Sequence, residues 1–112
     1  MSHISYLPVC KVSELQPGER LFLEISSHPI VIINHGREYF ALDDLCTHDD
    51  GPLGDGEVEN HEIICPRHGA RFNLRTGEAT ALPAVSGVNT YLTRIVDDHL
   101  EIGFLSNKIL LA

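Results

Sequence analysis

The residues best suited to chemistry in this chain form two cysteine–histidine pairs. Cys46 and His48 are separated by one residue, Cys65 and His68 by two, and sixteen residues lie between the pairs. Thiolate sulfur and imidazole nitrogen are side-chain ligands that bind zinc and iron in proteins. Because a turn within each pair can bring its two side chains to one place, the spacing predicts a metal centre held by Cys46, His48, Cys65 and His68.

Two kinds of metal centre fit this set of ligands. Two Cys and two His can hold a structural zinc ion, but zinc fingers usually take both Cys from one loop and both His from another. Here each loop supplies one Cys and one His. That mixture suits a two-iron cluster, in which one iron takes both thiolates and the other takes both imidazoles. The spacing favours the cluster and leaves zinc open. Gly51 and Gly69, which follow the two pairs, permit the tight backbone turns that metal loops use.

The rest of the chain predicts strands. Short apolar runs between turn signals predict strands over residues 4–9, 20–25, 30–33 and 38–42, and again over 88–96 and 100–105. Residues 34–37 and 97–98 have the composition of hairpin turns. Nowhere do apolar residues keep helical spacing for the ten to twelve residues a helix needs. We expect an all-β fold, an antiparallel sandwich or barrel; residues 106–112 either add a final strand or fray.

The segment with the predicted ligands differs from its flanks. Residues 43–83 are rich in Gly, Asp and Pro and have little periodicity. A loop of that length inside a small domain needs something to order it, and a metal centre would do so. The expected organisation is one domain over residues 1–112, with an all-β base and a loop-rich, metal-binding insert at about 43–83 between two of its strands.

The chain is acidic, with 8 Lys and Arg against 16 Asp and Glu and a formal net charge of −8. Nucleic acid binding requires a basic surface, which argues against that class of partner. Residues 43–83 contain nine Asp and Glu and three Arg, so their net charge is −6. We expect these acids to steer docking to a basic surface of a partner protein.

Two further features bear on location and on the third thiol. No apolar run reaches the roughly 18 residues of a membrane span, and the N-terminus lacks the charged and apolar regions of a signal peptide. We therefore expect no membrane anchor and a cytoplasmic protein. Three cysteines are an odd number, which argues against a disulfide framework. We expect Cys10 to be a small packed hydrophobe, and the five other histidines to be solvated.

The two pairs and their surroundings resemble the Rieske iron–sulfur family over nearly the whole chain. The matching segments are residues 46–48 and 65–72, the turn at 75–78 and the proline segment at 82–84. The resemblance implies one [2Fe–2S] cluster, with Cys46 and Cys65 on a buried iron and His48 and His68 on an outer iron. It also implies a Rieske-like β base with a cluster-binding insert.

Departures from the high-potential members of the family predict a low reduction potential. Those proteins resemble this chain but carry a loop-to-loop disulfide, and the matching positions here are Gly51 and Arg67. They also place Ser and Tyr hydroxyls near the cluster, where this chain has Ala70 and Phe72. Fewer hydrogen-bond donors stabilise the reduced cluster less, so we expect the low end of a range of roughly −150 to +300 mV.

The resemblance is strongest to free-standing ferredoxin components of ring-hydroxylating dioxygenase systems. It implies a monomeric one-electron carrier, not itself an enzyme, that takes electrons from a flavin-dependent reductase and passes them to a terminal oxygenase. One alternative within the family is the small subunit of an assimilatory nitrite reductase. An alternative of another class is a zinc-stapled binding module without a redox role, and colour discriminates it because zinc proteins do not absorb visible light.

Overall fold

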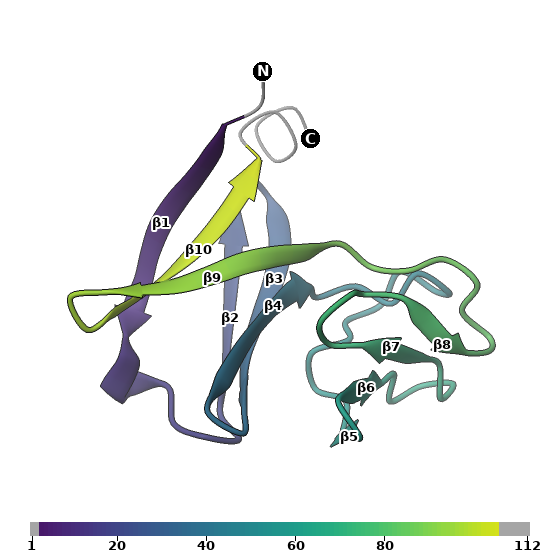
Figure 1. Cartoon of the computed structure of the whole chain (residues 1–112). Helices are drawn as coiled ribbons and strands as arrows, with labels where there is room; N and C mark the ends of the chain where they lie inside the picture. The colour runs from purple at the N-terminus through teal and green to yellow at the C-terminus, as the bar shows by residue number, and fades with distance from the viewer. Residues whose placement is uncertain (1–2, 106–112) are drawn as a thin grey trace.

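The chain folds into two antiparallel sheets of different size (Figure 1), and the computed structural model describes residues 3–105. The larger sheet is the base, with strand order β1-β10-β9-β4-β3-β2. Its strands are β1 (Ile4–Lys11), β2 (Arg20–Ile25), β3 (His28–His35), β4 (Glu38–Asp43), β9 (Thr90–Val96) and β10 (His99–Leu105). A single turn of 3-10 helix, η1 (Val12–Glu14), follows β1. The predicted all-β fold is therefore confirmed.

The strands of the base agree with the apolar runs in the sequence, although several boundaries move. The predicted strand over 20–25 is β2 without change, whereas the run at 30–33 extends to His28–His35 in β3. The hairpin between β3 and β4 turns at Gly36 and Arg37, both with positive φ, as a two-residue hairpin turn requires. The tail at 106–112, for which two outcomes were predicted, lies outside the described residues.

The smaller sheet lies between β4 and β9 in the sequence, as the sequence predicts for the insert. It consists of β5 (Val58–Glu59), β6 (Glu62–Ile64), β7 (Arg71–Asn73) and β8 (Ala79–Ala81), in that order. These strands are two or three residues long, so alternation of side chains does not reveal them in the sequence. The insert leaves and rejoins the base at one place, because Ala41 pairs with Tyr91 and Leu42 with Thr90.

Two clusters of buried side chains hold the molecule together, and β3 contributes to both. Val31 and Ile33 face the first cluster, whereas Ile30 and Ile32 face the second. Burial on both faces explains why β3 is an unbroken apolar run instead of an alternating strand. The second cluster lies within the base, around Leu100, Ile102 and the neighbouring strands.

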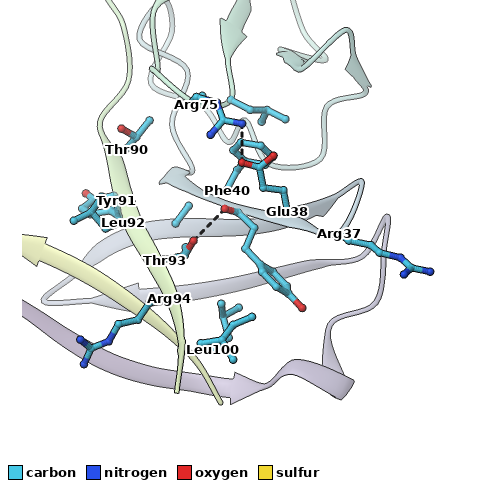
Figure 2. Close-up of a pocket in the computed structure, with 14 residues that line it drawn as sticks. Arg37, Glu38, Phe40, Arg75, Thr90, Tyr91, Leu92, Thr93, Arg94 and Leu100 are labelled. Atoms are coloured by element: carbon cyan, nitrogen blue, oxygen red, sulfur yellow. Dashed lines mark hydrogen bonds and ion pairs between the residues drawn. The ribbon is translucent and has the colours of Figure 1, made fainter. Parts of the chain in front are cut away.

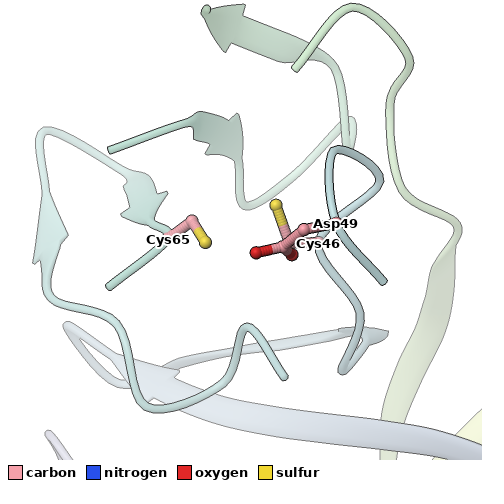
Figure 3. Close-up of side chains that lie close together, drawn as sticks. All are labelled: Cys46, Asp49 and Cys65. Carbon is pink, nitrogen blue, oxygen red and sulfur yellow. The ribbon is translucent and has the colours of Figure 1, made fainter. Parts of the chain in front are cut away.

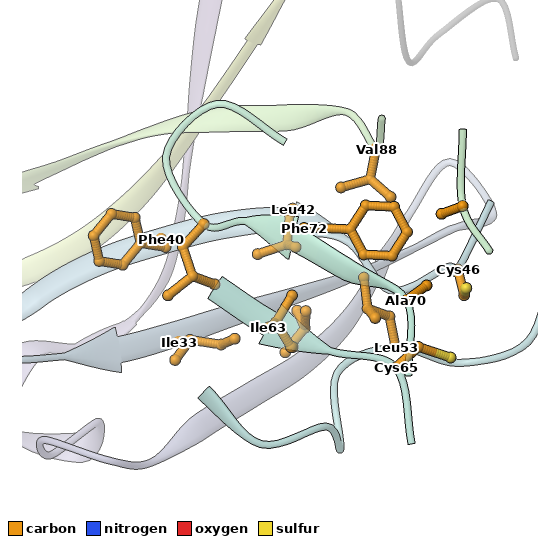
Figure 4. Packing of buried hydrophobic residues seen from close by; sticks show 13 residues of the cluster. Ile33, Phe40, Leu42, Cys46, Leu53, Ile63, Cys65, Ala70, Phe72 and Val88 are labelled. Carbon is orange, nitrogen blue, oxygen red and sulfur yellow. The ribbon is translucent and has the colours of Figure 1, made fainter. Parts of the chain in front are cut away.

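The first cluster joins the base to the insert (Figure 4). The base contributes Phe40 and Leu42 from β4, and the insert contributes Ile63 from β6 and Phe72 from β7. Cys46 and Cys65 belong to the same cluster. Burial of apolar surface between the two sheets therefore also fixes the position of the two thiols. In the described part of the chain, no helix is long and apolar enough to cross a membrane.

Candidate metal centre

The two ligand loops have the same backbone geometry. In the first, the N–H of Cys46 donates to the carbonyl of Gly51 (2.8 Å), and the N–H of Asp50 donates to the carbonyl of Cys46 (2.8 Å). In the second, the N–H of Cys65 donates to Ala70 (2.7 Å), and that of Gly69 donates to Cys65 (3.0 Å). Each loop is thus a tight turn closed on its own cysteine, which presents the following histidine at a defined place.

Local conformation explains why these residues form such turns. The fourth residue after each cysteine has positive φ, +60° at Asp50 and +78° at Gly69. Glycine adopts this conformation freely and Asp tolerates it better than most residues. The prediction that Gly51 permits the tight turn of the first loop is wrong, because Asp50 and not Gly51 adopts the left-handed conformation. A Cβ at Gly51 would lie 2.6 Å from Cζ of Arg67, so Gly51 instead makes room for that side chain.

The two thiols lie together in the interior (Figure 3). Cys46 is 0% and Cys65 1% exposed, although the two residues are far apart in sequence. Burial raises the pKa of the Cys46 thiol, and the neighbouring Cys65 adds to the rise, whereas the backbone N–H groups of His48 and Asp49 oppose it. A metal bound at this pair would displace the protons that the thiols otherwise keep.

The two imidazoles lie together on the surface. The rings of His48 and His68 are 5.2 Å apart, centroid to centroid, and meet edge to face at 86°. Both residues are exposed, and the His68 side chain retains 55% of its accessible surface. The structure therefore brings the four predicted ligands together as an inner thiol pair and an outer imidazole pair.

The segment after β8 packs into the same core as the thiols. Ala84 is 4% exposed and belongs to the same cluster as Cys46 and Cys65. The hydroxyl of Thr47 donates to the carbonyl of Ser86 (2.5 Å), which joins the first ligand loop to this segment. On either side of Ala84 the chain leaves apolar side chains in solvent, since Leu82 is 76% and Val85 83% exposed.

Asp44 and Arg20 hold the segment that follows the first ligand loop. Oδ1 of Asp44 accepts from the N–H groups of Leu53 (2.8 Å) and Gly54 (2.6 Å). Arg20 on β2 donates to the carbonyls of Gly54 and Gly56. These contacts hold residues 53–56 against the base, so the first ligand loop is anchored at its exit.

Arg67 and Asp49 connect the two ligand loops, a contact that the sequence analysis missed. The Arg67 guanidinium donates from Nε to Asp49 Oδ2 (2.6 Å) and from Nη2 to Asp49 Oδ1 (2.9 Å). This pairing holds the pKa of Asp49 well below its usual range, with help from the Gly51 N–H. The structure therefore pairs Arg67 with a residue of the other ligand loop. The available signal is that Asp49 directly follows one predicted ligand and Arg67 directly precedes another.

The remaining cysteine and histidines lie elsewhere. Cys10 is half-buried on β1 and packs against the second cluster, as expected for a small hydrophobe. His28 and His35 are half-buried, so the expectation that they are solvated is wrong for these two. His35 stacks edge to face against His61 at 5.0 Å, which links β3 to the turn between β5 and β6.

A cleft of about 470 Å³ opens between β4 and β9 (Figure 2). It is lined by Tyr39, Phe40, Thr93 and neighbouring residues, and the Thr93 hydroxyl donates to the carbonyl of Tyr39 across it (3.1 Å). None of the four predicted ligands lines this cleft, so the cleft is separate from the candidate metal centre.

The residues at the insert fit a two-iron cluster. Among the described residues, one group of three possible metal ligands has its ligand atoms within 4.8 Å of one another: Cys46, Asp49 and Cys65. Neither imidazole belongs to that group, so the four predicted ligands do not converge on one point. A centre with two metal atoms accommodates such an arrangement, with thiolate ligands at one end and imidazole ligands at the other.

Comparison with known proteins identifies the family. The family described as Rieske [2Fe-2S] domain matches residues 5–92. The ferredoxin component of biphenyl 2,3-dioxygenase from Rhodococcus jostii is 39% identical over 92 residues, which cover 82% of this chain and 86% of the relative.

Solved structures agree. The ferredoxin of carbazole 1,9a-dioxygenase from Nocardioides aromaticivorans IC177 superposes with a TM-score of 0.81 at 28% identity, covering 88% of this chain and 96% of that one. The ferredoxin fold also occurs, with a TM-score of 0.79 and 26% identity, in a complex of reduced oxygenase and oxidized ferredoxin, over 87% of this chain and 91% of that chain. The chain belongs to the Rieske family and carries one Rieske-type [2Fe–2S] cluster.

Proposed function

We propose that this chain is the ferredoxin component of a multicomponent oxygenase, a one-electron carrier and not itself an enzyme. We further propose that Cys46 and Cys65 hold one iron and His48 and His68 hold the other. The observation that carries the ligand assignment is the separation of the four side chains into a buried thiol pair and an exposed imidazole pair.

A single zinc ion fits this separation poorly. Tetrahedral zinc with bonds of about 2.0–2.3 Å requires all four ligand atoms within about 4 Å of one another. In the described residues the imidazoles of His48 and His68 do not join the thiols within 4.8 Å. The zinc-stapled binding module therefore lacks support from the geometry, and the family match argues against it as well.

The buried and the exposed residues of the centre have different roles in an electron carrier. When bound, the cluster accepts and releases one electron at a time. The thiols of Cys46 and Cys65 are shielded from water, which keeps that end of the site closed. The imidazoles of His48 and His68 are exposed, so a redox partner can approach closely there. Exposed Leu82 and Val85 flank Ala84, which shares the core of the thiols, and offer the partner apolar contact area.

The relatives indicate the partners. The similar protein of Rhodococcus jostii is named as a dioxygenase ferredoxin component, and a similar ferredoxin occurs in a complex with its oxygenase. We infer that this chain delivers electrons to a terminal oxygenase and receives them from a flavin-dependent reductase. We also infer that it works as a monomer in the cytoplasm. The first cluster contains residues of both base and insert, which supports a single Rieske domain.

The nitrite reductase alternative has weaker support. A putative nitrite reductase small subunit from Mycobacterium tuberculosis superposes with a TM-score of 0.81, but at 14% identity this likeness shows the fold alone. The carbazole dioxygenase ferredoxin superposes with the same TM-score and has twice the sequence identity, at 28%. The sequence comparison therefore favours the oxygenase system.

The assignment is tested on the purified protein by its visible spectrum when oxidised and its EPR spectrum when reduced with dithionite. We expect a coloured protein whose reduced form has an average g of about 1.9, from mixed His and Cys ligation. Cys65→Ser should remove the colour, whereas Cys10→Ser, the matched control outside the insert, should keep it. A colourless protein with stoichiometric zinc, or a coloured Cys65→Ser variant, would disprove the assignment. Reduction by a flavin reductase and reoxidation by a terminal oxygenase then test the place in the electron chain.

A further inference from the structure

The side chain of Arg67 crosses from the second ligand loop to the first. Besides its two hydrogen bonds to the Asp49 carboxylate, its Nη1 donates to the carbonyl of Pro52 (2.6 Å). The guanidinium therefore binds the first loop at two places, the Asp49 carboxylate and the Pro52 carbonyl oxygen. A planar guanidinium that donates in a bidentate manner fixes geometry as well as charge.

The surroundings of Arg67 are arranged for this contact. A Cβ at Gly51 would lie 2.6 Å from Cζ and 2.8 Å from Nε of Arg67, so a larger residue would displace the guanidinium. The N–H of Gly51 also donates to Asp49 Oδ1 (3.1 Å), which orients the carboxylate. The side chains of Arg67 and Asp49 retain only 32% and 23% of their accessible surface, so water competes only partly for the pair.

The contact joins two loops that share few other hydrogen bonds. Apart from a contact between the two thiols, Arg67 makes all the hydrogen bonds between residues 46–52 and 65–70 in the described structure. The remaining hydrogen bonds of each loop close it on itself or join it to other parts of the chain. Asp49 directly follows His48, and Oδ2 of Asp49 lies 3.6 Å from Nδ1 of His68. The ion pair therefore lies next to both predicted histidine ligands.

We propose that Arg67 is a positioning residue whose contacts with Asp49 and Pro52 clasp the two ligand loops around the cluster. The clasp is non-covalent, and it holds the loops at the level of the imidazole pair while the shared core holds them at the thiols. This proposal rests on the ligand set proposed above. It assigns Arg67 to cluster retention and imidazole placement, instead of to contact with a partner.

The test compares cluster loss from four purified holoproteins: wild type, Arg67→Gln, Asp49→Asn and the double variant. Decay of the visible absorption in excess EDTA gives the rate of loss. We expect Arg67→Gln to lose its cluster about tenfold faster, a usual effect of removing an outer-sphere partner from a metal site. The double variant should be no faster than Arg67→Gln, because the two residues act through one contact. Arg75→Gln is the matched control, since Arg75 forms an exposed ion pair with Glu38 (2.6 Å) at neither ligand loop, and it should decay like wild type.

Two further readouts separate positioning from general stability. The g values of reduced Arg67→Gln should differ from those of wild type, whereas those of Arg75→Gln should not. Added salt should speed cluster loss from wild type but not from Arg67→Gln, because only the former has an ion pair to screen. Gly51→Ala keeps both charges but displaces the guanidinium, so it should decay faster than wild type and serves where Arg67→Gln does not fold.

Wild-type decay rates and g values in Arg67→Gln, or a double variant that decays by the product of the two single effects, would overturn the clasp. These outcomes are distinct from failure of the proposed function. If the proposed function is wrong, the wild type itself lacks the two-iron signal. The clasp is tested only if the wild type shows that signal, by comparing the variants with it.

Discussion

Around the two thiols, the neighbouring side chains offer few hydrogen bonds. Ala70 and Phe72 are both fully buried, in the same cluster as Cys46 and Cys65, and neither side chain has a donor. Hydrogen bonds to sulfur stabilise the reduced form of an iron–sulfur cluster and so raise its potential. We therefore expect a midpoint at the low end of the family range, and a value above about +100 mV would contradict this.

Restoring one donor should raise the midpoint. In Ala70→Ser the new hydroxyl can donate toward the cluster, and a net hydrogen-bond contribution of about 1 kcal/mol corresponds to about 40 mV for a one-electron couple. Redox titration followed by visible absorption measures the shift. Ala79→Ser, at a partly buried position against the same cluster, is the control and should leave the midpoint within a few millivolts of wild type. Equal midpoints in wild type and Ala70→Ser would show that the hydroxyl does not reach the sulfur atoms.

The sequence predicts which residues form the metal centre better than it predicts the contacts between their side chains. The four predicted ligands follow from spacing alone, because few other arrangements place Cys and His so close together in two loops. The pairing of Arg67 with Asp49 could not be predicted in the same way. It depends on the direction in which the Arg67 side chain leaves its turn and on the space that Gly51 leaves for it.

Among the elements, β4 and β9 form the root of the insert. The hydroxyl of Tyr91 on β9 donates to Asp43 Oδ1 at the end of β4 (2.6 Å), and the N–H of Asp43 donates to the carbonyl of Asn89 (3.0 Å). Burial raises the pKa of Tyr91, and the carboxylate of Asp43 raises it further. The neutral hydroxyl therefore helps to hold β4 and β9 together where the insert leaves and rejoins the base.

The Tyr91 contact should make stability depend on alkaline pH. Because its folded-state pKa is raised, Tyr91 stabilises the fold fully below its unfolded value of about 10, and the contribution falls as pH rises above it. We expect Tyr91→Phe to lose about 1 kcal/mol at pH 7 and less at pH values above about 10. Urea unfolding of the holoprotein at both pH values measures the difference. Thr93→Val removes a non-titrating hydrogen bond between the same strands and should cost the same at both. A Tyr91→Phe deficit that does not shrink at high pH would refute the linkage.

Secondary structure was predictable wherever apolar residues could mark it. The six strands of the base follow apolar runs bounded by turn residues, and β3 is recognisable although both of its faces are buried. The strands of the insert were not predictable, because a strand such as Val58–Glu59 is too short for any alternation. They form because β6 and β7 pair on either side of the second ligand loop, so pairing between strands, and not the propensity of each strand, determines them.

For the molecule as a whole, negative charge is concentrated on the insert, and some of the acidic side chains there already form ion pairs. Several acids of the insert are already engaged, since Asp49 pairs with Arg67, and Glu59 and Glu62 with Arg71. Asp50 is exposed at the end of the first ligand loop, and no ion pair involving it is found among the described residues. We expect acids of this kind to draw a basic partner to the insert.

This steering is tested by reduction of a basic acceptor protein such as cytochrome c. The rate should fall as salt is added beyond about 0.1 M, where charges more than about 10 Å apart are screened. Asp50→Asn should lower the low-salt rate by a factor of about three. Asp98→Asn is the matched control, because Asp98 is also exposed and has a similar φ (+64° against +60°), but lies in the β9–β10 turn of the base, away from the insert (Figure 1). Equal rates in the two variants, or rates insensitive to salt, would count against steering.

The root of the insert has a consequence for how such proteins can be rebuilt. Its two ends leave neighbouring positions of β4 and β9, at Ala41 opposite Tyr91 and Leu42 opposite Thr90, so the redox segment could be exchanged without rerouting any strand of the base. The shared core sets the condition for such a transplant. Val31, Ile33, Phe40 and Leu42 pack directly against the insert. The transplantable unit is therefore the insert together with one face of the β3–β4 hairpin. A graft without this face would carry the predicted ligands on a poorly packed segment.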